Sequence, residues 1–86
     1  MRRITLEPQA LQDMQELALL DRKTLQRCLR IFTECTRTPF EGIGKPEPLK
    51  GSLSGFWSRR VNDADRIVYE VTPSEIIVHS LKGHYE

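Results

Sequence analysis

Residues 38–48 divide the chain into two parts that differ in hydrophobic periodicity. This segment holds three prolines and two glycines within eleven residues, and such a composition interrupts regular structure. Before it, apolar residues recur at intervals of three and four. After it, they tend to alternate with polar residues. The first pattern is typical of helices and the second of strands, so we predict a helical first part joined by a loop to a strand-rich second part.

The first part predicts a short strand followed by two helices. Residues 2–6 alternate as a strand does, and Pro8 suits the first turn of a helix. Asp21 is a typical N-cap for a second helix, which must end before Pro39. The apolar stripes that we expect to be buried are Leu11, Met14, Leu17, Ala18 and Leu20 in the first helix, and Leu25, Cys28, Leu29, Phe32 and Cys35 in the second.

The second part predicts an antiparallel meander. Strand patterns cover residues 56–61, 66–71 and 75–81, and turn residues separate them. Residues 49–55 are compatible with a short strand or a turn. With 86 residues the chain forms a single domain, 1–86, of the α+β class.

Side-chain alternation assigns faces to the strand at residues 66–71. Ile67, Tyr69 and Val71 share one face, which we expect to pack under the helices. Arg66 then projects from the opposite face. The pattern of residues 75–81 leaves both faces partly apolar, so it assigns no inward face there.

From the sequence we expect neither a membrane span nor a secretory signal. Hydrophobic residues make up 38% and charged residues 29%, but no apolar run approaches the roughly 20 residues that cross a bilayer. We therefore expect a cytoplasmic protein. Cys28 and Cys35 lie seven positions apart on one expected helix, about 10 Å along its axis. This separation is too large for a disulfide, so we expect both thiols to be reduced.

The charge distribution is more informative than the net charge of +1. Residues 37–66 carry six cations against four acids, which is compatible with a local site for an anion. A solvated surface with mixed charges would have the same composition, and charge alone favours that simpler interpretation.

A few side chains have the chemistry for cleaving RNA without a metal. Glu47 stands between two prolines, which restrict its backbone, and His84 can donate a proton near neutral pH. Arg66 and one of Arg59 or Arg60 can neutralise a phosphate. Taken one at a time, each is also explained as an ordinary surface residue. Further candidates are Lys50 as a phosphate contact, and Phe56 and Trp57, which either stack on bases or pack in the core.

Several segments together resemble the YoeB/Txe toxins of the RelE/ParE toxin–antitoxin superfamily. The similar segments are residues 38–50, 53–60 and 65–69, and the terminal pair His84-Tyr85. The resemblance implies a RelE-like fold, in which a small antiparallel sheet with an N-terminal strand carries a two-helix hairpin on one face.

The resemblance also implies an activity and partners. Members of this family cut messenger RNA on translating ribosomes, and Glu47 resembles their general base, His84 their general acid and Arg66 their transition-state arginine. Lys50, Tyr85 and, less closely, Arg59 resemble their substrate-contacting residues. No cofactor is implied. The implied partners are a cognate YefM/Axe-like antitoxin, the ribosome and its message, operator DNA only through the antitoxin complex, and a second copy of the chain in a homodimer.

Two other functions are compatible with the same fold. A ParE-like toxin would poison gyrase without cutting RNA, and an inactive toxin would serve only in antitoxin binding and repression. The pair Glu47 and His84 argues against the first, and growth arrest without a partner would argue against the second.

Overall fold

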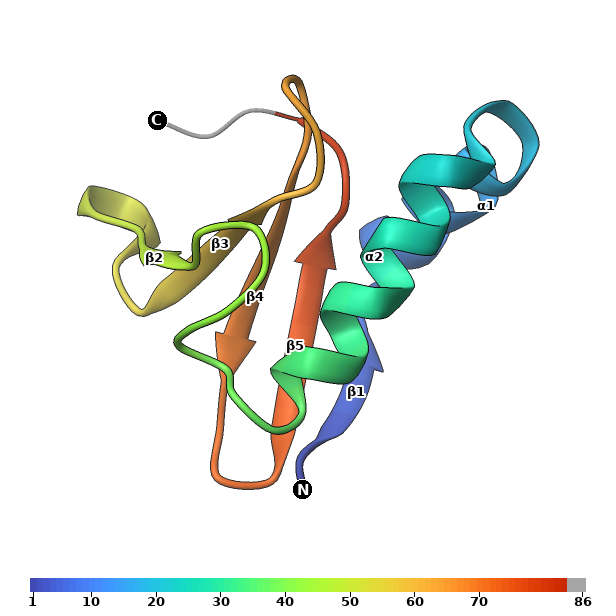
Figure 1. The fold of residues 1–86 in the computed structure, drawn as a ribbon. Coiled ribbons are helices and arrows are strands. Elements are labelled where there is room, and N and C mark those ends of the chain that lie inside the picture. The colour runs from blue at the N-terminus through green and yellow to red at the C-terminus, as the bar shows by residue number, and fades with distance from the viewer. Residues whose placement is uncertain (84–86) are drawn as a thin grey trace.

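The protein folds as one five-stranded sheet and two helices (Figure 1), and the computed structural model describes residues 1–83. The sheet has the order β1-β5-β4-β3-β2. The elements are β1 (Arg3–Leu6), α1 (Pro8–Leu20), α2 (Arg22–Cys35), β2 (Glu47–Pro48), a 3₁₀ helix (Gly51–Leu53), β3 (Phe56–Arg60), β4 (Arg66–Val71) and β5 (Glu75–Ser80). The α+β class predicted from the sequence is confirmed. Neither helix has the length and hydrophobicity needed to cross a bilayer, a finding that concerns residues 1–83.

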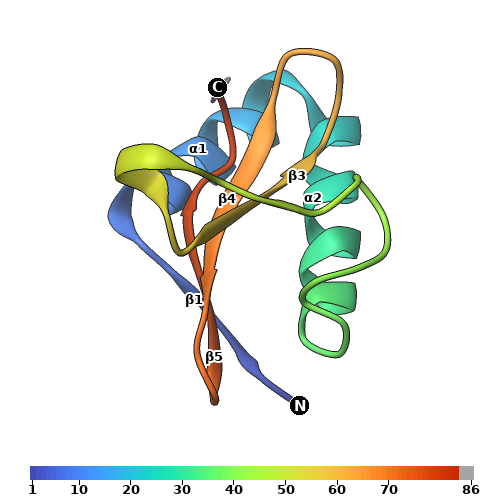
Figure 2. The same ribbon diagram turned by 90° about the vertical axis from the view of Figure 1, so that its left-hand side faces the viewer.

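The sheet is mixed, and in this respect it departs from the antiparallel sheet that we expected. Strands β2 to β5 pair antiparallel, but β1 runs parallel to β5, with Ile4 opposite Ile76. Parallel neighbours need a long connection between them, and here everything from α1 to β4 supplies it. The two ends of the described chain therefore contribute adjacent strands, as Figure 2 shows.

The edge strand β2 falls within the segment that we expected to be only a loop. Glu47 pairs with Ser58 and Pro48 with Trp57. A residue that precedes proline favours extended backbone, and an edge strand tolerates proline because one of its sides needs no partner. The segment that follows contains the 3₁₀ helix Gly51–Leu53 rather than a strand. Glu47 is consequently held by the sheet as well as by its neighbouring prolines.

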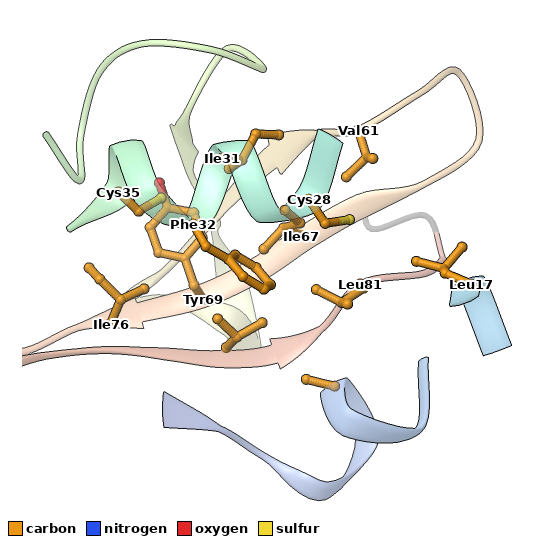
Figure 3. Close-up of a cluster of buried hydrophobic side chains, with 12 residues drawn as sticks. Leu17, Cys28, Ile31, Phe32, Cys35, Val61, Ile67, Tyr69, Ile76 and Leu81 are labelled. Atoms are coloured by element: carbon orange, nitrogen blue, oxygen red, sulfur yellow. The ribbon is translucent and has the colours of Figure 1, made fainter. Parts of the chain in front are cut away.

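Both helices cover the same face of the sheet (Figure 3). As predicted, Ile67 and Tyr69 of β4 point to the helices, and Ile76 and Val78 are the residues of β5 that join them there. The buried cluster contains Ala10, Leu17, Cys28, Ile31, Phe32, Cys35, Val61, Ile67, Tyr69, Ile76, Val78 and Leu81. Burial of these apolar groups supplies the main drive for folding.

The buried side of α1 is rotated from the predicted stripe by about one position. Leu11 and Leu20 are exposed, and Ala10, Asp13 and Leu17 are buried. Asp13 is tolerated in the interior because its carboxylate accepts the backbone N–H of Leu81 at 2.9 Å. This bond ties α1 to the chain that leaves β5.

The start of α2 and its cysteines agree with the sequence prediction. Asp21 caps the helix, because its carboxylate accepts the N–H of Thr24 at 3.2 Å and the Thr24 hydroxyl at 2.6 Å. Cys28 and Cys35 are free thiols and are fully buried. Burial raises the pKa of the Cys28 thiol to about 12.

This raised pKa leads us to expect lower stability in alkaline solution. The unfolded thiol ionises near pH 9, whereas the folded thiol of Cys28 stays protonated up to about pH 12. Between these values the unfolded state loses a proton that the folded state keeps, so the free energy of unfolding falls as pH rises. Urea unfolding at about pH 8 and about pH 10.5 measures the fall. Cys28→Ala should lose part of this pH dependence, and an identical slope in the variant would contradict the assignment.

Candidate active site

Two of the three predicted catalytic residues form an ion pair on the face of the sheet opposite the helices. The Arg66 Nη1 donates to Glu47 Oε1 at 3.0 Å. The arginine side chain is 13% exposed and the carboxylate side chain 58% exposed, so the carboxylate is open to a ligand while the guanidinium is largely held by the protein. The prediction that Arg66 projects away from the helices is confirmed.

The ion pair crosses over strand β3. Glu47 on β2 stands opposite Ser58, and Arg66 on β4 stands opposite Arg60. Because residues paired across a sheet share a face, all four belong to the helix-free face. We define the helix-free face as Glu47, Phe56, Ser58, Arg60, Arg66, Val68, Glu70, Ile77 and His79. His79 has no partner in the register, because the pairing of β4 with β5 is irregular there, and it joins this face through its ring contact with Phe56.

A tight turn places Arg66 at the start of β4. The Asn62 side-chain oxygen accepts the N–H groups of Ala64 and Asp65 at 2.8 and 2.7 Å, which is the Asx-type turn expected from this composition. The chain then enters β4 directly. Arg66 therefore has a fixed backbone position, from which its guanidinium reaches the edge strand.

The described chain ends beside Arg66. The Arg66 N–H donates to the Gly83 carbonyl oxygen at 3.1 Å, and the Gly83 N–H donates to the Asp65 carboxylate at 3.1 Å. One residue earlier, Lys82 contacts Glu16 of α1 at 2.7 Å. Together with the bond from the Leu81 N–H to Asp13, four contacts thus fix the chain up to Gly83. The predicted site residues His84 and Tyr85 lie outside the described residues.

The expectation that Arg59 contacts a substrate needs correction, because its side chain is fully buried and has no surface with which to do so. Its guanidinium has five N–H groups, and all five are engaged within the protein. Their acceptors are the Tyr69 hydroxyl at 3.2 Å, Glu34 Oε1 at 2.6 Å, and the carbonyls of Ile43 at 3.2 Å, Thr38 at 2.5 Å and Glu41 at 3.0 Å. Arg59 instead holds the segment that leads into β2.

The charges in this network stabilise each other. Burial opposes the charge on Arg59, but hydrogen bonds to Tyr69 and Glu34 outweigh it, and the pKa of Arg59 is raised. Burial also acts against ionised Glu34, yet the Arg59 guanidinium and the Ile43 N–H hold the pKa of its carboxyl below the usual value. The Tyr69 hydroxyl in turn donates to the Pro39 carbonyl at 2.7 Å. The hydrogen bonds of Arg59, Glu34 and Tyr69 to the loop backbone thus fix the loop that precedes Glu47.

The remaining predicted contacts lie at the surface. Lys50 is exposed and directly precedes the 3₁₀ helix after β2, and Arg60 is exposed on the helix-free face. Within residues 1–83 no cluster of three His, Cys, Asp or Glu side chains forms a candidate metal site.

The sequence did not indicate a second group on the helix-free face. The rings of Phe56 on β3 and His79 on β5 stack, with centroids 4.5 Å apart and planes 15° apart. His79 Nε2 lies 3.2 Å from Glu70 Oε1. The sequence signal that places His79 opposite the core is its alternation with the buried Val78. Trp57, by contrast, contacts Phe40 of the loop, with ring centroids 4.8 Å apart.

Comparison with known proteins identifies the family of the chain. Residues 6–85 match the family model described as the YoeB-like toxin of bacterial type II toxin-antitoxin systems. The chain is 45% identical to Toxin RelK of Mycobacterium tuberculosis over 85 residues, covering 99% of this chain and 100% of the relative. It is 43% identical to Toxin YoeB of Streptomyces coelicolor over 83 residues, covering 96% and 99%.

Solved structures show the same fold. A YoeB/ParE toxin from Agrobacterium tumefaciens superposes with a TM-score of 0.92 at 33% identity, over 96% of this chain and 99% of that one. A YoeB dimer from Staphylococcus aureus gives 0.91 at 39% identity, over 98% of each chain. A YoeB–YefM complex from the same organism gives 0.88 at 37% identity, over 99% of each chain. The chain belongs to the YoeB-like toxins of bacterial type II toxin-antitoxin systems.

Proposed function

We propose that this toxin is a ribosome-dependent endoribonuclease that cuts messenger RNA and thereby stops translation. The observation that carries the proposal is the exposed Glu47 carboxylate, paired with Arg66 at 3.0 Å, beside the point where the described chain ends at Gly83. His84 follows Gly83 in the sequence. A carboxylate, a guanidinium and an imidazole suffice for cleavage of a ribose phosphate by acid–base chemistry.

In the proposed reaction, Glu47 removes the proton from a ribose 2′-hydroxyl, whose oxygen then attacks the adjacent phosphorus. Arg66 stabilises the negative charge that develops on the phosphoryl oxygens. His84 gives a proton to the departing 5′-oxygen. The products are a 2′,3′-cyclic phosphate and a free 5′-hydroxyl. This proton transfer needs no metal, and DNA is not cut because it lacks the attacking hydroxyl.

The resting ion pair is compatible with this role. The Glu47 carboxylate lies at the surface and in contact with Arg66, so it is accessible to a ribose hydroxyl. When RNA binds, the phosphate competes with Glu47 for Arg66, since both are anions that suit its fork of donors. The carboxylate is then released beside the substrate. Lys50 and Tyr85 are proposed to contact the substrate.

We also propose that the toxin is held inactive by a cognate antitoxin of the YefM kind, and that it works in the cytoplasm on ribosome-bound message. Two of the solved relatives are YoeB–YefM complexes from Staphylococcus aureus, and a third is a YoeB dimer. A second copy of this chain is accordingly a further proposed partner. Operator DNA would be bound only through the antitoxin complex.

Expression of the toxin without an antitoxin tests the proposed function. We expect growth arrest, together with new message ends that carry a 5′-hydroxyl and arise only on translated RNA. The double variant with Glu47→Ala and His84→Ala should arrest neither growth nor translation. Growth arrest with intact message would instead indicate a ParE-like action, and the absence of arrest would indicate a module that only binds its antitoxin.

A further inference from the structure

A stacked ring pair extends the helix-free face away from the Glu47–Arg66 ion pair. Phe56, Glu70 and His79 come from three neighbouring strands, β3, β4 and β5. The two rings stack at 4.5 Å, and Glu70 Oε1 lies 3.2 Å from His79 Nε2, a contact that fixes the orientation of the imidazole. We call Phe56 and His79 the ring platform. Each of its residues is half-buried, so part of its surface is open to solvent.

We propose that the ring platform binds a nucleobase of single-stranded RNA, at a nucleotide next to the one that is cleaved. The inference rests on the proposed function and extends it: base binding by the ring platform would help to determine which RNA sequence is cut. Aromatic and imidazole rings stack on any base, and a stacking residue near an arginine is the usual combination for holding single-stranded nucleic acid.

The geometry connects the platform with the candidate active site. Arg66 and Glu70 lie on β4 with Val68 between them, and all three belong to the helix-free face. Four strand residues correspond to about 13 Å, so a base on the platform belongs to a neighbouring nucleotide and not to the cleaved one. Val68 and Ser58 lie between the two groups in the register and are buried.

The distribution of charge also suits RNA. Arg60 is exposed beside Arg66, so cations gather at the end of the face where a phosphate must bind.

Binding of an uncleavable RNA tests the platform. The probe is a short single-stranded RNA that carries 2′-O-methyl groups throughout and 2-aminopurine at one position, since this base loses fluorescence when it stacks. We expect quenching at one position near the cleavage site. Phe56→Leu and His79→Ala should each abolish the quenching and weaken binding about tenfold, the scale expected for one stacked base. His79→Phe keeps a ring and should retain both.

Controls separate stacking from simple packing. Phe40→Leu changes another half-exposed ring, which contacts Trp57 and lies off the helix-free face, and it should bind the probe as the wild type does. Phe56→Leu preserves apolar volume, and circular dichroism establishes that each variant is folded. If both Phe56→Leu and His79→Ala are folded and bind the probe as tightly as the wild type, the proposal that the ring platform binds a nucleobase is wrong.

Two further outcomes are informative. A wild-type toxin that cuts message in cells but shows no position-dependent quenching of the probe would overturn the platform and leave the proposed function intact. A toxin that neither binds the probe nor cuts message would overturn both. If the platform variants lose affinity only for the antitoxin, the ring pair is a protein contact and the RNA proposal is wrong.

Discussion

Replacement of Arg59 by methionine is expected to lower the free energy of unfolding by about 3 kcal/mol or more. Removing one partner of a buried ion pair typically costs about 3–5 kcal/mol, and Arg59 is fully buried. The variant leaves the Tyr69 hydroxyl, a Glu34 carboxylate oxygen and three loop carbonyls without their donor. We take the lower end of the range because the Glu34 side chain is 29% exposed and can recruit water. A domain of this size has little stability to lose.

Urea unfolding measures this loss, and the adjacent residue offers a matched control. Arg60→Met makes the same chemical change at an exposed position, where substitutions usually alter stability by less than about 0.5 kcal/mol. If the two variants unfold at the same urea concentration, the Arg59 network does not stabilise the fold as described. Any activity that Arg59→Met retains should be compared at a temperature where it is folded.

Replacement of Glu47 by glutamine is expected to lower the rate of message cleavage by about a hundredfold to ten-thousandfold, the usual contribution of a general base. The fold should be unaffected, because the Glu47 side chain is 58% exposed and its one ion pair is at the surface. Single-turnover cleavage of ribosome-bound message measures the rate of each protein.

Glu41→Gln is the matched control for this substitution. Glu41 is an exposed acid in the same loop, and the bond from Arg59 is to its backbone carbonyl, which the substitution preserves. It should cut at nearly the wild-type rate. Equal rates for Glu47→Gln and Glu41→Gln would remove Glu47 from the mechanism.

Much of the fold could be predicted because local signals agreed with each other. Asp21, Pro39 and the Asn62 turn delimit their elements through their own side chains or rings, and such effects can be read from sequence. The parallel pairing of β1 with β5 could not be read in this way. It joins residues more than 70 positions apart, such as Arg3 and Glu75, and depends on how the whole chain packs.

The burial of Arg59 and Asp13 was missed for a related reason. Charged residues are almost never buried unless they are paired, and their partners here lie far away in sequence: Glu34 and Tyr69 for Arg59, and the Leu81 N–H for Asp13. Alternation puts Arg59 and Arg60 on opposite faces of their strand, but it does not show what would satisfy a buried guanidinium. The loop carbonyls that do so belong to the segment with the least regular structure.

The sequence identified individual candidate residues of the site but not their arrangement in space. The resemblance to YoeB-like toxins pointed to Glu47 and Arg66, and the strand alternation placed Arg66 on the correct face. Their contact depends on β2 pairing with β3, a register that two residues at an edge establish. The ring platform depends in the same way on β3, β4 and β5 lying side by side. Cross-strand neighbours of this kind follow from register, which sequence patterns specify only weakly at edges.

The central claim is attack by a ribose 2′-hydroxyl, and one substitution in the substrate tests it directly. A message with a single deoxyribose at the cleaved nucleotide is placed on ribosomes and mixed with the wild-type toxin. We expect cleavage at that bond to be lost, with cleavage elsewhere in the message unchanged. Cleavage at the same bond and the same rate, without the hydroxyl, would contradict the mechanism assigned to Glu47, Arg66 and His84.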